Sequence, residues 1–449
     1  MGGKPWLEKF RRDFKDKRVL ILGLGLLGRG AADARFLAEI GAQVMVTDLK
    51  EKKALKPSLE ELKGLPLRFV LGKHRKKDIL NSDLILRNAA VPINSAWLNL
   101  ARKNKVRIEM DGSLFAQYAP VKIIGITGTR GKSTTTTLIY QILKKARRSV
   151  WLAGNIRGRA SLPLLEKINQ DDWVVMELSS WQLQAFRQAE ISPQVSLVTS
   201  IFEDHLNRYP SMKAYLADKK AIFQSQAKDD LLFLNKDSAL VRSFAQEAKS
   251  QIYWFGKEDF PAGWQLKLKG GHNRLNAAGA IKLTQALGIK WPVIKKAVEA
   301  FSGLPHRLET AAEINGIQYV NDSTSTTPAA GIAALNSFRK PIVLIAGGNS
   351  KKLAMEGFAR EIVRKAKQVV FLEGDETDNL LNLVRKLGGR EKIKGRFKDL
   401  KKAVYQARRL ADLGEVILLS PGCTSFGTFA NEFDRGEKFK KTVKEMEKD

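Results

Sequence analysis

The sequence predicts an α/β protein of three domains, each built on a sheet of mostly parallel strands. Three observations support this: a glycine turn near residue 23, a second near residue 128, and four later strands that each run into a Gly-, Asp- or Ser-containing cluster. Strands alternating with helices are typical of parallel sheets covered by helices. We expect an N-terminal Rossmann-like domain at 1–111, a central P-loop ATPase domain at 112–304 and a C-terminal Rossmann-like domain at 305–449.

The first glycine turn lies within residues 18–48, RVLILGLGLLGRGAADARFLAEIGAQVMVTD. Gly23, Gly25 and Gly28 form G-x-G-x-x-G between a strand and a helix, and Asp48 ends the second strand. This pattern indicates a Rossmann-like unit that can hold a dinucleotide or a nucleoside diphosphate. A turn needed only for tight strand–helix packing is the alternative. A further strand, Leu84–Leu86, leads to the segment RNAAVP.

The second turn lies within residues 121–139, VKIIGITGTRGKSTTTTLI, and predicts a phosphate-binding loop. The loop consists of Gly128, Thr129, Arg130 and Gly131, and a helix follows it. Glycines let backbone N–H groups close around a phosphate, and the helix N-terminus adds its dipole. Lys132 supplies a cation for the terminal phosphates, and the Ser133 hydroxyl can bind Mg²⁺. A Gly/Thr-rich turn at a helix start is the alternative reading, and Gly125 precedes Gly131 by six residues where five is usual.

Two strands of the central segment end near residues suited to a metal ion. Trp173–Met176 ends at Glu177, and Val195–Thr199 runs toward Asp204 and His205. Because the carboxyl ends of parallel strands meet at one edge of a sheet, we expect Glu177 and His205 beside the phosphate loop. Glu177 can bind Mg²⁺ there or act as a base on a metal-bound water. A purely structural histidine is the alternative.

Two later helices carry polar residues. Met212–Phe223 predicts an amphipathic helix, and the pattern alone indicates that its Lys219 and Lys220 are solvated. In a later helix Asn273 and Asn276 are three residues apart, so both can face one ligand.

The C-terminal segment again alternates strand and helix after a linker with His306 and Arg307. The predicted strands are Gln318–Val320, Pro341–Ala346, Val369–Leu372 and Val416–Leu419. They run into the clusters NDSTSTTPAA, GGNSKK, EGD and SPGCTSFGTF. These clusters predict a ligand-binding edge at the carboxyl ends of a third parallel sheet.

The composition is that of a globular protein with an unusual charge. Of 449 residues, 44% are hydrophobic and 28% are charged, and the net charge is +30. One cysteine, the lack of an apolar signal and the lack of a ~20-residue apolar run predict the cytoplasm and no membrane span. So large a charge attracts polyanions. Its spread along the whole chain, without a basic tail, favours a solvated basic surface over a nucleic-acid site.

Seven ordered motifs resemble the Mur ligase family. They are GTRGKSTTT, ELSSWQL, EDHLNRYP followed by Tyr215 and Lys219, HNRLNAAGA, GLPHRLE, NDSTST and LSPGCTSF. The match covers nearly the whole chain and is most similar to the branch that adds glutamate to UDP-N-acetylmuramoyl-L-alanine in peptidoglycan synthesis. The resemblance implies an ADP-forming ligase that binds the UDP-substrate, ATP and glutamate on its first, second and third domains and proceeds through an acyl phosphate. We expect it to be a monomer.

The resemblance also implies roles for individual residues. Ser133 and Glu177 would hold one Mg²⁺, and His205 would help to hold a second. Lys219 matches the lysine that the family carbamylates, and its carbamate would be an acidic group of the metal site. The catalytic set is Lys132, Glu177, His205 and Lys219. The ATP set is Gly128, Thr129, Arg130, Gly131, Lys132, Ser133, Thr134, Asn273, Arg307 and Asp322. The UDP-substrate set is Gly23, Leu24, Gly25, Asp48 and Asn155, and the amino-acid set is Thr326, Lys351 and Ser425.

Departures from the family pattern leave the added amino acid open. Thr324 stands where the turn usually has a lysine, and Glu432 stands where an aromatic residue is common. In the N-terminal domain, RNAAVP replaces the usual S/N-P-G before a proline. D-Glutamate is the expected substrate, with L-glutamate or another amino acid as the alternative.

Two other classes compete with this resemblance. A folylpolyglutamate synthase-like enzyme would share the phosphate loop, but the G-x-G-x-x-G domain before that loop argues against it. A phosphate-loop protein acting on nucleic acid would bind polynucleotides in a salt-sensitive way. The ordered motifs favour the ligase over both.

Overall fold

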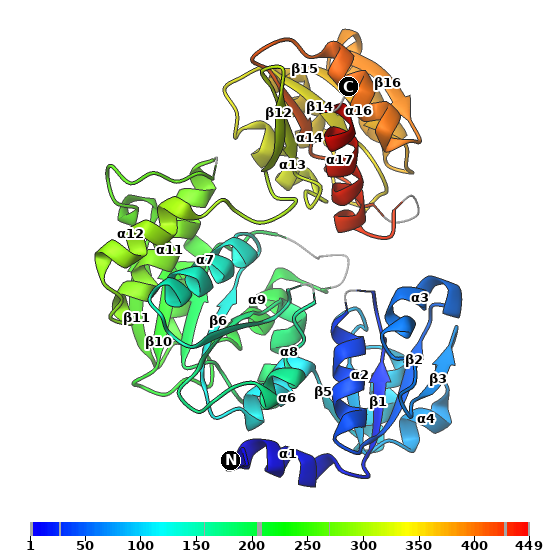
Figure 1. The fold of residues 1–449 in the computed structure, drawn as a ribbon, viewed down its shortest axis with the longest axis vertical. Helices are drawn as coiled ribbons and strands as arrows, with labels where there is room; N and C mark the ends of the chain where they lie inside the picture. The colour runs from blue at the N-terminus through cyan, green and yellow to red at the C-terminus, as the bar shows by residue number, and fades with distance from the viewer. Residues whose placement is uncertain are drawn as a thin grey trace. The chain divides into compact units, whose positions relative to one another are not determined.

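The computed structural model describes residues 3–26, 28–156, 158–203, 209–268, 270–425 and 429–447. Its strands form three sheets, of five, six and six strands (Figure 1). The chain makes two compact units, Met1–Gly263 with Leu275–Val298 and Trp264–Arg274 with Glu299–Asp449. The predicted α/β class with mostly parallel sheets is confirmed. None of the helices within the described ranges is long and apolar enough to cross a lipid bilayer.

The first sheet has the order β3-β2-β1-β4-β5 with every pair parallel, as a Rossmann-like domain requires. Its strands are β1 (Arg18–Leu22), β2 (Gln43–Asp48), β3 (Arg68–Leu71), β4 (Leu84–Arg87) and β5 (Arg107–Glu109). Its helices are α1 (Pro5–Phe14), α2 (Arg29–Glu39), α3 (Lys52–Glu60), α4 (Lys76–Leu80) and α5 (Ala96–Lys103). The sequence pattern does not predict β3 and β5, because these edge strands are short and partly exposed.

Alternate residues of β1 face opposite sides of this sheet. Val19 and Ile21 pack in the same core as Phe36 of α2. Leu20 and Leu22 pack on the other side, with Ile79 of α4 and Leu98 of α5. Both faces of the sheet are therefore covered, which explains why its central strand is apolar from Val19 to Leu22.

The second sheet has the order β11-β10-β9-β6-β8-β7, and all of its pairs are parallel. Its strands are β6 (Lys122–Thr127), β7 (Val150–Gly154), β8 (Trp173–Glu177), β9 (Val195–Val198), β10 (Leu231–Asn235) and β11 (Gln251–Phe255). The helices of this segment are α6 (Asp111–Tyr118), α7 (Lys132–Lys145), α8 (Ser180–Gln188), α9 (Met212–Lys220), α10 (Ala239–Arg242), α11 (Gly271–Ala286) and α12 (Trp291–Ala300). The predicted strand–loop–helix order of the phosphate loop is confirmed.

The third sheet has the order β12-β13-β17-β14-β15-β16. Its strands are β12 (Glu309–Ile314), β13 (Ile317–Asn321), β14 (Ile342–Ala346), β15 (Ala366–Leu372), β16 (Ile393–Phe397) and β17 (Val416–Leu419). Its helices are α13 (Pro328–Leu335), α14 (Glu356–Lys365), α15 (Thr377–Lys386), α16 (Leu400–Leu410) and α17 (Glu432–Met446). The four predicted strands are present. The edge strands β12 and β16 are additional, and β12 runs antiparallel to β13.

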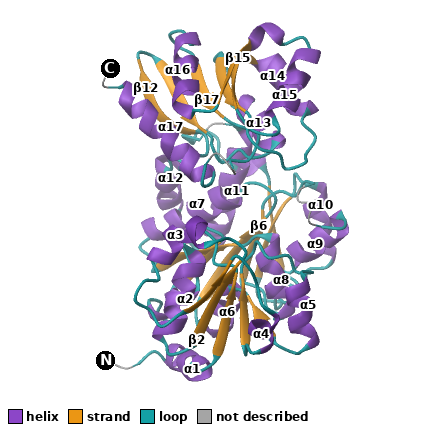
Figure 2. Cartoon of the chain, turned by 90° about the vertical axis from the view of Figure 1, so that its right-hand side faces the viewer, coloured by secondary structure: helices purple, strands orange, loops and turns teal. Residues whose placement is uncertain are grey.

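Helices cover both faces of the third sheet. Figure 2 shows α16 and α17 on one side and α13, α14 and α15 on the other. The buried residues divide in the same way, into one core with Phe358 of α14 and a second with Val404 of α16 and Phe439 of α17. The carboxyl ends of the parallel strands are left for loops and ligands.

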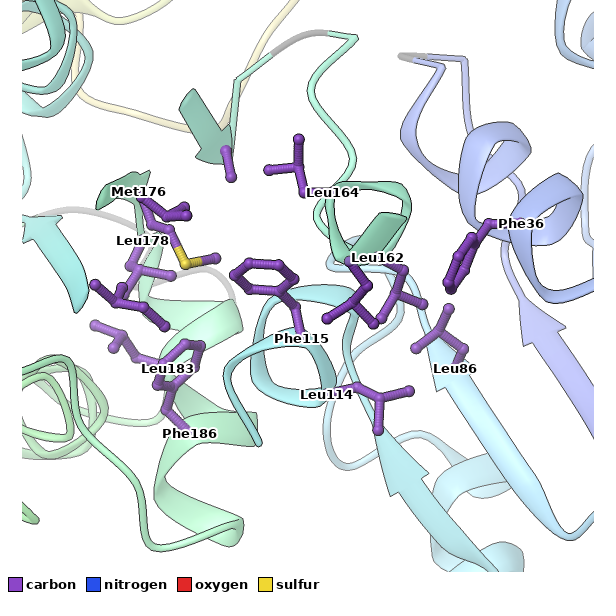
Figure 3. Packing of buried hydrophobic residues seen from close by; sticks show 14 of the residues in the cluster. Phe36, Leu86, Leu114, Phe115, Leu162, Leu164, Met176, Leu178, Leu183 and Phe186 are labelled. Carbon is purple, nitrogen blue, oxygen red and sulfur yellow. The ribbon is translucent and has the colours of Figure 1, made fainter. Parts of the chain in front are cut away.

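A continuous apolar core joins the first sheet to the second within the first unit. Leu114 and Phe115 of α6 lie in its middle, with Leu86 on one side and Leu183 and Phe186 on the other (Figure 3). Full burial of one such side chain contributes about 1.5–3 kcal/mol. This packing brings the end of β4 close to α8.

Candidate active site

The phosphate loop between β6 and α7 needs glycine at two positions. Gly128 (φ +146°) and Gly131 (φ +85°) have backbone angles that other residues rarely adopt. A Cβ atom on Gly128 would lie 1.9 Å from Thr199 Oγ1, and one on Gly131 would lie 2.1 Å from Asn276 Oδ1. The loop therefore closes tightly against the segment after β9 and against α11.

Hydrogen bonds hold the loop to that segment. The Thr129 N–H donates to Ser200 O (2.6 Å), and Thr199 Oγ1 donates to Arg130 O (2.6 Å). The Thr129 hydroxyl lies 3.0 Å from the Tyr215 hydroxyl of α9. The loop is held in one shape, and the N-terminus of α7, whose first turn includes Thr134, adds partial positive charge. This is the preorganisation that binding of an anion requires.

Two ammonium groups converge on one carbonyl oxygen of the loop. Lys132 Nζ donates to Gly128 O (3.0 Å) and Thr129 O (3.1 Å), and Lys219 Nζ donates to Gly128 O (2.8 Å). Lys219 is only 1% exposed, and its Nζ lies 4.8 Å from the centre of the Tyr215 ring. The Lys132 ammonium and the N-terminus of α7 supply positive charge that suits a triphosphate.

The prediction that Lys219 and Lys220 are both solvated is wrong for Lys219. α9 packs against α8, and its buried residues are Tyr215, Asp218 and Lys219. Lys220 instead forms an ion pair with Glu247. The buried residues lie three and four positions apart, so they share one helix face. Because these core positions hold polar residues, the pattern of hydrophobic residues does not show which face of the helix is buried.

Glu177 ends β8, the strand beside β6, and is 2% exposed. Its Oε1 accepts a hydrogen bond from Asn155 Nδ2 at 3.0 Å. Its Oε2 is buried and has no hydrogen-bond partner among the described residues. A buried carboxylate oxygen of this kind is costly unless a cation binds it, so the position fits a divalent metal ion.

The remaining predicted metal ligands are Ser133 and His205. Ser133 lies in the first turn of α7 and is partly exposed. His205, like Asp204, lies outside the described residues. Within the described ranges no three His, Cys, Asp or Glu side chains cluster as a metal site. Mg²⁺ in nucleotide sites commonly uses one or two carboxylates with phosphates of the substrate, which agrees with this donor set.

α11 carries both asparagines that were predicted to share a ligand. Asn276 packs against Gly131, and Thr135 Oγ1 of α7 donates to Asn276 O at 3.5 Å. Asn273 is 8% exposed and belongs to the second unit. A contact of Asn273 with ATP stays a prediction.

The first glycine turn is organised around Asp48. Its glycines, all with positive φ, are Gly23, Gly25 and Gly28. Asp48 Oδ2 accepts from Leu24 N (2.9 Å) and Gly25 N (3.2 Å), and Oδ1 accepts from Lys50 N (2.8 Å). Asp48 thus holds the glycine turn with Oδ2 and the backbone that follows β2 with Oδ1. Direct contacts of Asp48, Leu24 and Asn155 with a substrate stay predictions.

In the second unit, two residues predicted for the amino acid lie together. Lys351 Nζ, from the loop after β14, donates to Thr326 Oγ1, from the loop after β13, at 3.0 Å. Ser425 is 3% exposed, and its hydroxyl has no hydrogen-bond partner among the described residues. Ser425 follows Thr424, whose carbonyl accepts from Asn349 N at 3.0 Å. The loops that carry the three predicted residues therefore meet at one edge of the third sheet.

Asp322 of the same edge is almost fully buried, and burial raises its pKa to about 7. Hydrogen bonds from Ser420 Oγ (2.8 Å) and Leu308 N (3.2 Å) act in the opposite direction, as does the charge of Arg307. This carboxyl group therefore titrates near neutral pH, and its contact with ATP stays a prediction.

Sequence reasoning misses Arg435 of α17, which is 1% exposed. Its guanidinium donates to Ser323 Oγ (3.0 Å), Ser323 O (2.8 Å) and Cys423 O (3.4 Å). It ties the loop after β13 to the loop after β17. An arginine in a charged helix gives no sign of such a role, because its burial depends on loops distant in the sequence.

Two family models match this chain. A Mur ligase middle domain matches residues 126–278, and a Mur ligase glutamate ligase domain matches residues 306–423. The chain is 40% identical over 458 residues to the UDP-N-acetylmuramoylalanine–D-glutamate ligase of Roseiflexus sp. (strain RS-1), covering 95% of this chain and 98% of that protein. The chain belongs to the Mur ligase family. This Mur ligase is also 34% identical to the protein of the same name from Clostridium kluyveri, over 98% of this chain and 99% of that one.

Solved structures show that this Mur ligase shares its fold with other members. MurC of Thermotoga maritima is 20% identical with a TM-score of 0.65, covering 96% of this chain and 100% of that one. MurF of Thermotoga maritima in complex with ADP is 18% identical with a TM-score of 0.59, covering 90% and 96%. A Mycobacterium tuberculosis folylpolyglutamate synthase has a TM-score of 0.56 at 14% identity over 73% of this chain and 93% of that one. At these identities the likeness concerns the fold alone.

Proposed function

We propose that this Mur ligase uses ATP to add D-glutamate to UDP-N-acetylmuramoyl-L-alanine in peptidoglycan precursor synthesis. The relatives at 40% and 34% identity are named for this activity. The observation that carries the chemistry is the site itself, in which Lys132 and Lys219 converge on the loop and Glu177 ends the adjacent strand. We expect the enzyme to act in the cytoplasm as a monomer.

The reaction needs a site of this charge. A carboxylate is a poor electrophile, so its oxygen must first be phosphorylated to become part of a leaving group. The substrate carboxylate attacks the γ-phosphorus of ATP and ADP departs, leaving an acyl phosphate. The amino group of glutamate then attacks the acyl carbon, and phosphate leaves with formation of the amide bond. Attack of one anion on another demands concentrated positive charge, which Lys132 provides.

Mur ligases use ATP and Mg²⁺. We assign Ser133, Glu177 and His205 to two Mg²⁺ sites. For Glu177 the assignment is supported by its buried Oε2, which has no hydrogen-bond partner in the described part of the chain. Bound there, Mg²⁺ would neutralise phosphate charge. The protein's own part is to hold Glu177 in place through Asn155 and to keep the loop closed.

Lys219 is proposed to carry a carbamate. The ammonium would first lose a proton, and the free amine would then add to CO₂ and release a second proton, which leaves an anionic carbamate able to bind a metal ion. Its 1% exposure and its position at the phosphate loop support this assignment. The anion would lie where Lys132 and the metal ions provide opposite charge.

The remaining assignments follow the three domains, proposed as 1–111, 112–304 and 305–449. The UDP-substrate is assigned to the first turn and Asn155, and ATP to residues 128–134 with Asn273, Arg307 and Asp322. The amino acid is assigned to Thr326, Lys351 and Ser425, supported by the Thr326–Lys351 hydrogen bond and the buried Ser425 hydroxyl.

The test measures phosphate release with ATP, Mg²⁺ and UDP-N-acetylmuramoyl-L-alanine. D-Glutamate, L-glutamate and a panel of other amino acids are supplied one at a time. We expect release to require both the nucleotide-sugar and D-glutamate. Release with L-glutamate alone would change the stereochemistry of the proposal, and hydrolysis indifferent to both substrates, or stimulated by polynucleotides, would overturn it.

A further inference from the structure

Arg87 is a buried cation at the end of β4, within the segment RNAAVP that departs from the usual family pattern. It is 4% exposed and is satisfied by neutral acceptors. Its Nη1 donates to Val91 O (3.0 Å), and its Nη2 donates to Trp181 O (2.9 Å) and Gln184 Oε1 (3.0 Å). Trp181 and Gln184 belong to α8, so Arg87 connects the first sheet to the central segment.

Gln184 extends this connection to α9. Its Nε2 donates to Asp218 Oδ2 at 2.7 Å, and Asp218 is 4% exposed. Only one orientation of the Gln184 amide satisfies both neighbours, with its oxygen toward the cation and its nitrogen toward the carboxylate. The amide is therefore polarised from both sides, which strengthens each hydrogen bond.

Asp218 directly precedes Lys219, whose Nζ donates to Gly128 O of the phosphate loop at 2.8 Å. Arg187 of α8 holds the other Asp218 oxygen at 3.2 Å. The α9 turn that carries Lys219 is thus fixed by two groups of α8, one of which is held by Arg87. Two hydrogen bonds lead from Arg87 of β4 through Gln184 to Asp218, and the backbone of α9 joins Asp218 to Lys219, which bonds to the phosphate loop.

The other side of Arg87 faces the first glycine turn. Arg87, Asn88 and Gly23 line one small cavity of about 30 Å³. Asn88 Nδ2 lies so close to the turn that a Cβ atom on Gly25 would come within 3.1 Å of it. Arg87 therefore lies between the turn assigned to the UDP-substrate and the helix that carries Lys219.

We propose that Arg87 is a positioning residue for catalysis, acting through Gln184 and Asp218 on the Lys219 turn. The inference rests on the proposed ligase activity. It predicts that the catalytic lysine keeps its place at the phosphate loop only while the end of β4 is attached to α8. The nucleotide-sugar domain would thereby influence acyl-phosphate formation without contributing an atom to it.

The apolar core of this junction should keep an Arg87 variant folded. Leu86, Phe115 and Leu162 pack there with Leu183 and Phe186 (Figure 3). Arg87→Met retains much of the side-chain volume but removes the donors, and Arg87→Lys retains the charge with fewer donors. Arg68→Met, at an exposed position of β3, is the matched control.

The experiment measures kcat and the KM of each substrate for these variants. We expect Arg87→Met to lower kcat about 30-fold while the nucleotide-sugar KM changes by less than about threefold, and Arg87→Lys to recover part of the loss. Arg68→Met should match the unmodified enzyme. A kcat within about threefold of the unmodified enzyme, or a loss confined to the nucleotide-sugar KM, would overturn the positioning role.

Gln184→Leu alone tests the path if Arg87→Met does not fold, and the double variant tests whether the two residues act through each other. Gln184→Leu should lower kcat by a similar factor, and adding Arg87→Met to it should cost less than about threefold more. Losses that multiply would show that the two residues act independently, against the inference. An unmodified enzyme without ligase activity would instead refute the proposed function, so the two failures are distinguishable.

Discussion

The two glycine turns of the first unit share a backbone design and differ in charge. Each follows a central parallel strand and leads into a helix whose N-cap glycine, Gly28 or Gly131, has a positive φ. At the first turn a carboxylate, Asp48, accepts from the backbone N–H groups of Leu24 and Gly25. At the second, the Lys132 ammonium donates to the Gly128 carbonyl, and Lys219 Nζ donates to the same oxygen. Backbone shape alone therefore does not decide which turn receives a triphosphate.

The carboxylates beside the two turns, Asp48 and Glu177, also differ in how many of their oxygens are hydrogen-bonded. Both carboxylate oxygens of Asp48 accept hydrogen bonds from backbone N–H groups, Oδ2 from the glycine turn and Oδ1 from Lys50. Glu177 uses one oxygen for Asn155, and the other has no hydrogen-bond partner in the described ranges. The first carboxylate is part of the architecture, whereas the second is available to a cation. Four substitutions test whether the first turn and its carboxylate are structural while the second turn and Glu177 serve catalysis.

Lys132→Ala should have the largest effect. Without this ammonium the γ-phosphate charge is uncompensated, and we expect ATP-dependent turnover to fall by about 10³-fold or more. Lys144→Ala, an exposed lysine in the last turn of the same helix, is the control and should leave turnover unchanged. Coupled detection of ADP measures both. Full turnover in Lys132→Ala would contradict the assignment of the triphosphate to this loop.

Lys219→Ala should have the second largest effect on activity, and Lys220→Ala, at the neighbouring position, is its control. Loss of the buried group should reduce kcat by about 10²–10³-fold, with partial rescue by short carboxylates that replace the carbamate. Lys220 pairs with Glu247 near the surface, and exposed pairs contribute little, so Lys220→Ala should remain active. Circular dichroism checks that both variants fold. An active Lys219→Ala enzyme would contradict the proposal that Lys219 carries a catalytic carbamate.

Glu177→Gln should weaken metal dependence without weakening the fold. The amide keeps an acceptor for Asn155 but loses the charge, so the Mg²⁺ concentration for half-maximal activity should rise about tenfold or more. Removing a buried, unpaired charge should leave the free energy of unfolding unchanged or higher. Titration with Mg²⁺ and urea denaturation measure the two effects. A clear loss of stability would mean that Glu177 is structural, as Asp48 is.

The fold could be predicted from the sequence wherever strands are apolar and turns carry glycine. β1, β4, β6 and β8 are buried on both faces and read as apolar runs, so the pattern shows them directly. The edge strands β3, β5, β12 and β16 are half-exposed, and their mixed residues do not distinguish them from loops. The antiparallel direction of β12 comes from a two-residue hairpin turn, Asn315-Gly316, in which both residues have a positive φ, and this Asn-Gly pair is the local signal from which the hairpin could have been predicted.

The candidate site divides in the same way. The glycine loop, Lys132 and Glu177 follow from local motifs at strand ends, where geometry is fixed by the sheet. The burial of Lys219 and Arg435 depends on which helices and loops pack over them, and no short-range pattern contains that information. The resemblance to a known family identified Lys219, whereas the Arg87–Gln184–Asp218 connection became visible only once β4, α8 and α9 were placed together.

Asp48→Asn should have the smallest effect and the most specific one. An asparagine offers one acceptor oxygen where Asp48 accepts three backbone hydrogen bonds, so an N–H group must lose its partner. We expect a loss of about 1–3 kcal/mol in the free energy of unfolding. The KM for the nucleotide-sugar should rise about tenfold while the KM for ATP stays constant. Asp83→Asn, at a partly exposed ion pair with Arg18 in the same sheet, is the control. A rise in the KM for ATP in Asp48→Asn would show that the two turns are not independent. The difference in charge would then not explain why one turn binds the nucleotide-sugar and the other binds ATP.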